Sequence, residues 1–198
     1  VRRHLVTQTI ASLKPFEAER DTSSPNRNLA PVTTCLDEQD RLVVGGCVLS
    51  ELAQRYGTPL YVLDEETVRG TCRAYRDALK QHYPGESLPV YATKANSSLL
   101  MSSIAAAEGL GLDAVSAGEL LTALQGGMPG ERMVLHGNNK NDEELLLAYN
   151  NKVTVVVDNQ HDLDRLKALI PADAEPARLM LRFTPGIECH THEYIRTG

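Results

Sequence analysis

From residue 88 onward, the chain alternates between two patterns of hydrophobic and polar positions. Short runs of β-branched and other apolar residues, such as VTVVV at 153–157, are each followed by a longer segment in which apolar residues recur every three or four positions. The first pattern is typical of a strand buried in a sheet, and the second is typical of an amphipathic helix. Repeated alternation of the two predicts βαβ units around a parallel sheet, so the predicted fold class is α/β.

Five strand-like and four helix-like segments can be delimited in this region. Strands are expected within residues 88–95, 110–116, 132–138, 153–159 and 177–185, and helices within residues 97–109, 117–127, 141–151 and 160–170. Each unit takes ~20–28 residues, which suits one unit of a (β/α)8 TIM barrel, with a doubly wound sheet as the main competitor. A whole barrel needs ~250 residues. The 110 residues of the segment 89–198 therefore predict an incomplete barrel of about five β/α units.

Two helix starts carry a capping signal. Ser116 precedes Glu119 by three positions, and Asn141 precedes Glu144 by three positions. In a capping box the first side chain accepts from the backbone N–H three residues on, and the carboxylate accepts from the backbone N–H of the capping residue. We expect both pairs to form such boxes.

The segment before residue 88 has a different character. Residues 1–40 are rich in Arg, Ser, Thr and Asn without a sustained period, and we interpret them as a disordered tail. Two arginines near the start would suit an organelle transit peptide, but the acidic residues that follow argue against one. Residues 41–63 predict a short strand, a Gly-Gly turn, a helix and a second strand at 60–63, and residues 67–82 have helical spacing.

Composition and charge exclude several classes of protein. The 198 residues are 42% hydrophobic and carry a formal net charge of −6, which argues against general nucleic-acid binding. No apolar run approaches the ~20 residues that a membrane-spanning helix needs, so we expect no membrane partner. The four cysteines form no CxxC pair and no metal-ligand spacing, which favours reduced thiols in a cytosolic protein and no metal site.

Polar residues gather where the predicted strands end, and that is the functional edge of parallel α/β folds. They are Lys94, Asn96, Asp113, Ser116, His136, Asn138, Asn139, Asp158, Arg182 and Thr184. Lys94 follows the apolar run of Leu88, Val90, Tyr91 and Ala92 in the first of these strands, with Thr93 between. A lysine amine sheltered from water at such a position can form a Schiff base with a carbonyl compound. The alternative is that Lys94 ends a strand with its ammonium group in water.

Four blocks of sequence resemble a known family. They are YATKAN at 91–96, LGLDAVSAGELLTAL at 110–124, GGMPGERMVLHGNNKNDEELLLAY at 126–149 and RFTPGIECHTHEYIRTG at 182–198. YATKAN resembles the cofactor-lysine motif of the fold-type III pyridoxal 5′-phosphate (PLP) decarboxylases. In order and spacing, the three later blocks are similar to those of the diaminopimelate decarboxylases within that group. The resemblance covers roughly residues 41–198. The combination of the four blocks is far more specific than any single short motif.

The resemblance implies a fold, a cofactor and a reaction. The fold is the alanine racemase-like barrel, with residues 67–198 forming part of the PLP-binding barrel and residues 41–66 contributing to a second β domain. Lys94 carries PLP as a Schiff base and is the catalytic residue. Four further residues lie near the cofactor, namely Asp113, His136, Asn138 and Arg182. The cation of Arg182 would need a carboxylate partner.

The implied reaction is the decarboxylation of meso-diaminopimelate to L-lysine. The implied protein is a homodimer that acts on a small amino-acid substrate in the cytoplasm, or in a plastid if the tail is a transit peptide. The family's remaining cofactor-binding groups follow the matched blocks. The resemblance therefore identifies the chain as a catalytically incomplete amino-terminal part.

Other interpretations of the same residues stay open. Asp113 can simply orient its neighbours, Arg182 can lie in a buried ion pair, and His136 with Asn138 can belong to a turn with satisfied amides. For Glu119 a capping role alone is enough. For the whole chain, the alternatives are a non-catalytic PLP carrier, another fold-type III amino-acid decarboxylase and an inactive fragment. The segment 41–63 and the HGNNK block argue against the carrier.

Overall fold

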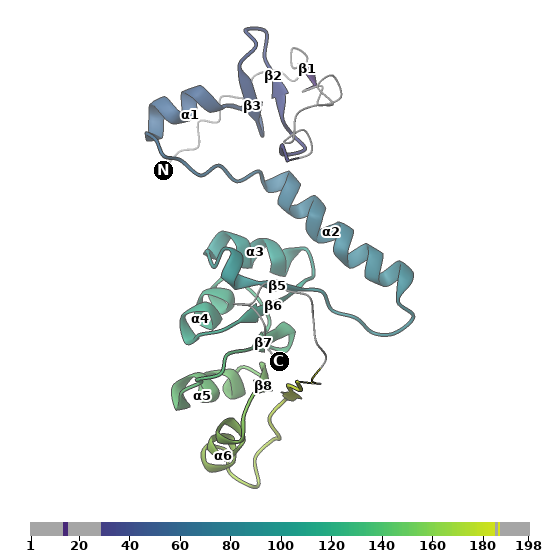
Figure 1. Ribbon diagram of the computed structural model, residues 1–198, viewed down its shortest axis with the longest axis vertical. Coiled ribbons are helices and arrows are strands. Elements are labelled where there is room, and N and C mark those ends of the chain that lie inside the picture. Colours follow the sequence, from purple (N-terminus) through teal and green to yellow (C-terminus); the bar gives the residue numbers. More distant parts are fainter. Residues whose placement is uncertain (1–13, 16–28, 185, 187–198) are drawn as a thin grey trace. The chain divides into compact units, whose positions relative to one another are not determined.

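The computed structural model describes residues 14–15, 29–184 and 186. By its internal contacts the chain divides into two compact units, Val1–Ala74 and Tyr75–Gly198. The larger unit holds the predicted alternation of strands and helices and is drawn in teal to yellow in Figure 1. Among the described helices, none combines the length and the apolar character needed to cross a membrane.

The larger unit is built on a five-stranded parallel sheet. The strands run in sequential order and are β5 (Val90–Ala92), β6 (Gly111–Ala114), β7 (Met133–Leu135), β8 (Thr154–Val157) and β9 (Leu179–Leu181). Each observed strand lies inside one of the five predicted windows, so the strand predictions and the α/β class are confirmed.

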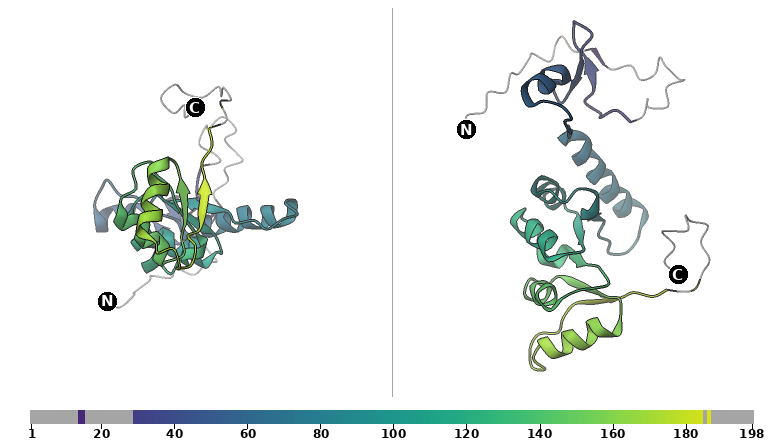
Figure 2. Two further views of the ribbon diagram at one scale, coloured as in Figure 1. Left: turned by 90° about the horizontal axis from the view of Figure 1, so that it is seen from below. Right: turned by 60° about the vertical axis from the view of Figure 1, so that its left-hand side comes forward.

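Four helices alternate with these strands along the chain, as predicted. They are α3 (Leu99–Ala107), α4 (Ala117–Gln125), α5 (Asp142–Asn150) and α6 (Gln160–Leu169). Figures 1 and 2 show all four along one face of the sheet. A doubly wound sheet would carry helices on both faces and reverse its strand order. The sequential order with one covered face therefore rules out that competitor and matches part of a barrel.

The core of this unit fills the space between the sheet and its helices. Every second strand residue points to the helices, because side chains alternate across a strand. The residues with at most 1% exposure include Ile104, Leu112, Leu120, Met133, Leu135, Leu145 and Val155. Burying one such side chain stabilises the fold by ~1.5–3 kcal/mol, so this layer is the main source of stability.

The opposite face of the sheet has no described helix on it. Ala92, Asp113 and Val134 are neighbours in register on adjacent strands, and Val134 is paired with Thr154 in the next strand. Paired residues share a face, so these four side chains belong to the face away from the helices. On an edge strand of the same sheet Met180 is half exposed. In a closed barrel this face would line the interior.

The smaller unit contains a four-stranded antiparallel sheet. Its strands are β1 (Lys14–Pro15), β2 (Cys35–Leu36), β3 (Leu42–Val44) and β4 (Cys47–Val48), paired in that order. The helix α1 (Leu49–Tyr56) follows β4 directly, and α2 (Glu65–His82) begins in this unit. The predicted strand at 41–44, the Gly-Gly turn and both helices are thus present.

Two predictions for this region are wrong. Residues 35–36, which the sequence analysis placed in a tail, form β2 and pair with β3. Hydrogen bonds from the backbone N–H groups of Gln39 and Arg41 to the Asp37 carboxylate fix the turn between them. The predicted strand at 60–63 does not form, and its side chains are exposed. Those four residues are apolar enough for a strand, but no described strand pairs with them.

One of the two predicted capping boxes is confirmed. Asn141 accepts from the Glu144 N–H and Glu144 accepts from the Asn141 N–H, which completes the box at α5. At α4 only half of the box exists. Ser116 accepts from the Glu119 N–H at 3.3 Å, but the Glu119 carboxylate does not return to the Ser116 N–H. It binds elsewhere, as described below.

Candidate active site

The predicted site residues lie along one edge of the five-stranded sheet. All four pairings are parallel, so the carboxyl ends of the five strands meet at the same edge. In chain order, each strand contributes one charged or titratable residue there, namely Lys94, Asp113, His136, Asp158 and Arg182. The sequence thus identified this edge correctly.

Lys94 lies in a single turn of 3-10 helix, η2 (Thr93–Ala95), directly after β5. The turn is braced on one side by the Tyr91 hydroxyl, which donates to the Asn96 carbonyl at 3.0 Å. Lys94 itself is exposed, and its amine makes no hydrogen bond or ion pair with any residue that the structure describes. The expectation of a lysine sheltered from water is therefore wrong for this chain.

Asp113 and His136 contact each other. The His136 Nδ1 and the Asp113 Oδ1 form a short hydrogen-bonded pair between the ends of β6 and β7, and both side chains are half-buried. The backbone N–H of His136 also donates to the Ala114 carbonyl at 2.8 Å, which continues the sheet pairing to this residue. The sequence placed both residues on the edge but did not predict their contact. A carboxylate in this position orients the imidazole ring.

Arg182 pairs with Asp158 at the other end of the edge. The Arg182 Nη1 lies 3.1 Å from the Asp158 Oδ1, and the Arg182 backbone N–H donates to the Val157 carbonyl at 3.1 Å. The carboxylate partner that the arginine was expected to need is thus supplied by the neighbouring strand end. The alternative of a buried arginine is wrong, because the Arg182 side chain is 44% exposed.

Asn138 lies in the loop after β7 and is exposed, and its backbone carbonyl accepts from the Asn159 Nδ2 at 3.4 Å. The residue that anchors this loop is Lys140, which the sequence did not single out. Lys140 is buried, and its Nζ donates to the Asp162 carboxylate at 2.8 Å and to the Gly137 carbonyl. The sequence shows a lysine in HGNNK and an acid, Asp162, within the predicted helix 160–170, but this pattern does not reveal that the two side chains are buried together.

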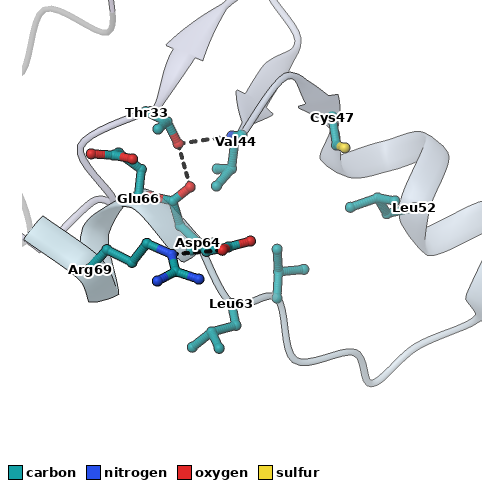
Figure 3. Close-up of a pocket in the computed structure, with 11 residues that line it drawn as sticks. Thr33, Val44, Cys47, Leu52, Leu63, Asp64, Glu66 and Arg69 are labelled. Atoms are coloured by element: carbon teal, nitrogen blue, oxygen red, sulfur yellow. Dashed lines mark hydrogen bonds and ion pairs between the residues drawn. The ribbon is translucent and has the colours of Figure 1, made fainter. Parts of the chain in front are cut away.

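The smaller unit has a separate cavity of about 510 Å³. Figure 3 shows Thr33, Cys47, Asp64 and Arg69 among the residues that line it. Its polar groups are already satisfied, since Asp64 accepts from the Thr33 hydroxyl at 2.7 Å and Arg69 pairs with Glu65 at 2.8 Å. Burial raises the pKa of the Asp64 carboxyl, but hydrogen bonds from Thr67 and Thr33 outweigh burial and lower this pKa overall. No residue of the carboxyl edge lines this cavity.

Known proteins are similar to this chain both in sequence and in fold. The sequence profile of the family described as "Pyridoxal-dependent decarboxylase, pyridoxal binding domain" matches residues 65–198. A diaminopimelate decarboxylase from Synechocystis sp. is 45% identical over 183 residues, which is 88% of this chain and 39% of that protein.

Solved structures agree on the fold. The crystal structure of a diaminopimelate decarboxylase from M. jannaschii superposes with a TM-score of 0.71 at 29% identity, over 81% of this chain and 38% of that one. The Helicobacter pylori diaminopimelate decarboxylase, complexed with L-lysine, gives a TM-score of 0.68 at 31% identity, over 76% and 38% of the two chains. The open five-stranded sheet is thus an incomplete barrel of the alanine racemase-like type. The chain spans about two fifths of the length of these relatives.

Proposed function

The chain belongs to the pyridoxal-dependent decarboxylases, whose pyridoxal-binding domain its residues 65–198 match, and on that premise we propose that it is the lysine-bearing part of an enzyme that decarboxylates meso-diaminopimelate to L-lysine. The substrate is proposed from the 45% identity to a diaminopimelate decarboxylase and from the L-lysine bound in a structural relative. The observation that carries the proposal is the free amine of Lys94 at the carboxyl edge of a parallel sheet, with the Asp113–His136 pair on the next two strands.

The described residues fit pyridoxal phosphate by their chemistry. An aldehyde requires an accessible, unpaired amine, and Lys94 provides one. We assign the remaining contacts with the cofactor to Asp113, His136, Asn138 and Arg182, which lie at or beside the same edge. When bound, pyridoxal phosphate supplies a conjugated ring that accepts the electron pair left behind when the substrate loses its carboxylate as carbon dioxide.

The roles of the chain's own residues follow from their contacts. Lys94 Nζ would hold the aldehyde of the cofactor, because no described residue engages this amine in a hydrogen bond or an ion pair. Asp113 accepts a hydrogen bond from His136 Nδ1 and so fixes the imidazole plane at the edge. Asp158 holds the guanidinium group of Arg182 at the end of β9, where it contributes a fixed positive charge.

Further parts of the proposal concern the whole protein. We assign residues 67–198 to the barrel and residues 41–66 to a second β domain. The small antiparallel sheet and the exposed apolar segment 60–63 support the second assignment, because further strands could pair with them. We also propose a homodimer and a cytoplasmic location. Sedimentation of the natural full-length protein tests the dimer.

Borohydride trapping tests the site. The chain is incubated with pyridoxal phosphate, reduced with borohydride and digested, and pyridoxyl-modified peptides are mapped by mass spectrometry. We expect selective modification of Lys94 and its loss in Lys94→Ala. Lys140 is buried in its ion pair with Asp162, and Lys80, Lys152 and Lys167 lie in or directly after helices, away from this edge. Modification spread evenly over Lys80, Lys152 and Lys167 would refute the assignment of Lys94. Release of carbon dioxide from meso-diaminopimelate by the natural full-length protein, against ornithine and arginine as competing substrates, tests the reaction.

A further inference from the structure

We propose that Glu119 is a positioning residue that holds the Lys94 turn against the end of β6. This inference rests on the proposed function, since it concerns the placement of the cofactor-binding amine. Sequence reasoning had assigned Glu119 to capping of α4 alone.

The contacts of Glu119 connect two strand ends. Its Oε2 accepts from the Thr93 hydroxyl at 2.6 Å and from the Val115 N–H at 2.7 Å. Thr93 directly precedes Lys94 and is 2% exposed, and its hydroxyl also lies 2.9 Å from the Asp113 carbonyl oxygen. Val115 follows Asp113 by two residues. One carboxylate oxygen therefore joins the turn after β5 to the strand end that carries Asp113.

These contacts are not those of a helix cap. In a complete capping box the carboxylate would accept from the N–H of its own N-cap residue, as Glu144 does with Asn141 at 3.0 Å. The Glu119 carboxylate does not accept from the Ser116 N–H. It accepts from Thr93 after β5 instead, while the Ser116 side chain still accepts from the Glu119 N–H. The cap of α4 thus does not need the Glu119 carboxylate, and that carboxylate is available for the Lys94 turn.

The turn needs such an anchor because it is short and exposed. η2 has three residues, and Lys94 and Ala95 in it are exposed. Buried Thr93 is its one inward-facing residue, and the Thr93 hydroxyl has two acceptors, the Glu119 carboxylate and the Asp113 carbonyl. A displacement of a reacting group by about 1 Å can reduce its reactivity by ~100-fold. Loss of this anchor should therefore reduce modification of Lys94 by at least ~10-fold.

The geometry suggests variants that separate the acceptor role from overall stability. Both donors meet the same oxygen, so Glu119→Gln can keep both contacts through its amide carbonyl, whereas Glu119→Ala loses both. In the same way Thr93→Ser keeps the hydroxyl, and Thr93→Val removes it at nearly constant shape. Glu144→Ala is the matched control. The Glu144 carboxylate likewise accepts from two donors, the backbone N–H groups of Asn141 and Ala117, but contacts neither Thr93 nor Lys94.

The experiment combines two readouts on the chain and its variants. Amide hydrogen exchange at Val115 reports the contact itself without any cofactor, and borohydride trapping with pyridoxal phosphate reports the reactivity of Lys94. We expect Glu119→Ala to accelerate exchange at Val115 and to lower Lys94 modification at least ~10-fold. Thr93→Val should lower modification similarly, while Glu119→Gln, Thr93→Ser and Glu144→Ala stay within about twofold of the parent chain. Far-UV circular dichroism verifies that each variant is folded.

The outcomes distinguish the inference from the proposed function. Faster exchange at Val115 with unchanged Lys94 modification in a folded Glu119→Ala variant would overturn the inference alone. Unchanged exchange at Val115 would do the same, because the contact would then be absent. An equal loss of Lys94 modification in Glu144→Ala would mean that a general loss of stability causes the effect, and it would also overturn the inference. Absence of Lys94 modification in the parent chain would refute the proposed function, and this inference with it.

Discussion

Replacing Lys140 by methionine removes the positive partner of a buried ion pair. The Lys140 and Asp162 side chains are 2% and 1% exposed, and the Lys140 Nζ lies 2.8 Å from the Asp162 Oδ2. In Lys140→Met, the carboxylate of Asp162 keeps only the Asp158 N–H at 3.2 Å as a partner for that oxygen. The substitution also frees the Gly137 carbonyl, which Lys140 now holds, and with it the loop that carries Asn138.

The magnitude follows from the burial of the carboxylate that remains. Breaking a buried pair by removing one partner costs about 3–5 kcal/mol, because the remaining charge has neither water nor a counterion. A domain of ordinary stability has ~5–15 kcal/mol in total. The substitution should therefore remove about a fifth or more of the stability of the larger unit. With a urea m-value of ~2 kcal/mol/M, the unfolding midpoint falls by about 2 M.

Urea unfolding followed by far-UV circular dichroism measures this loss. The double variant Lys140→Met/Asp162→Leu should regain most of it, since an apolar pair of similar volume leaves no unpaired charge. Lys152→Met is the matched control, because Lys152 forms a 4.0 Å pair with Glu131 in which both side chains are more than half exposed. That control should cost less than about 0.5 kcal/mol. A loss below ~1 kcal/mol in Lys140→Met, or no recovery in the double variant, would refute the reasoning.

Two further predictions concern the same unit. The Arg165 guanidinium, hydrogen-bonded to Asp142, lowers the pKa of that carboxyl below its ordinary value of 3.8. The contribution of this pair to the stability of the fold is therefore complete above the ordinary pKa, and it is lost as the pH falls through the lowered pKa. Asp142→Asn should thus lower the urea midpoint at neutral pH and have little effect in strong acid, and an equal effect at both would contradict this. Gly130→Ala would place its Cβ 1.6 Å from the Asn151 carbonyl oxygen and should cost ~1–3 kcal/mol in thermal unfolding. The control is Gly118→Ala, whose added Cβ would lie 3.9 Å from its nearest neighbour, the Ser116 Oγ. This control should stabilise α4 by ~0.5–1 kcal/mol. Equal effects of the two substitutions on thermal unfolding would contradict the prediction.

Most of the fold of the larger unit could be predicted, because its information is local. The apolar runs and the helical spacing define strands and helices one at a time, and the parallel order follows from their alternation. Parallel order also brings all strand ends to one edge, so Lys94 and Arg182 could be placed together although they are far apart in the sequence. The capping box of Asn141 and Glu144 was predictable for the same reason, since it involves one turn of chain.

Predictions failed where a residue's partner lies far along the chain. Residues 35–36 read as a tail because the pattern of a two-residue strand is too short to recognise, yet pairing with β3 orders them. Residues 60–63 have the composition of a strand, but a strand exists only if another strand pairs with it. Lys94 was expected to be sheltered, but shelter depends on which elements cover the open face of the sheet.

The sequence by itself therefore determined the α/β alternation, the edge at which the candidate site residues lie and the lysine at that edge. Tertiary structure alone decided which side chains meet there. It paired Asp113 with His136 and Asp158 with Arg182, buried Lys140 against Asp162, and turned Glu119 away from its own helix cap toward Thr93. The physical reason is that periodicity depends on neighbours within a turn or a strand, whereas hydrogen bonds and desolvation depend on groups that only the folded sheet brings together.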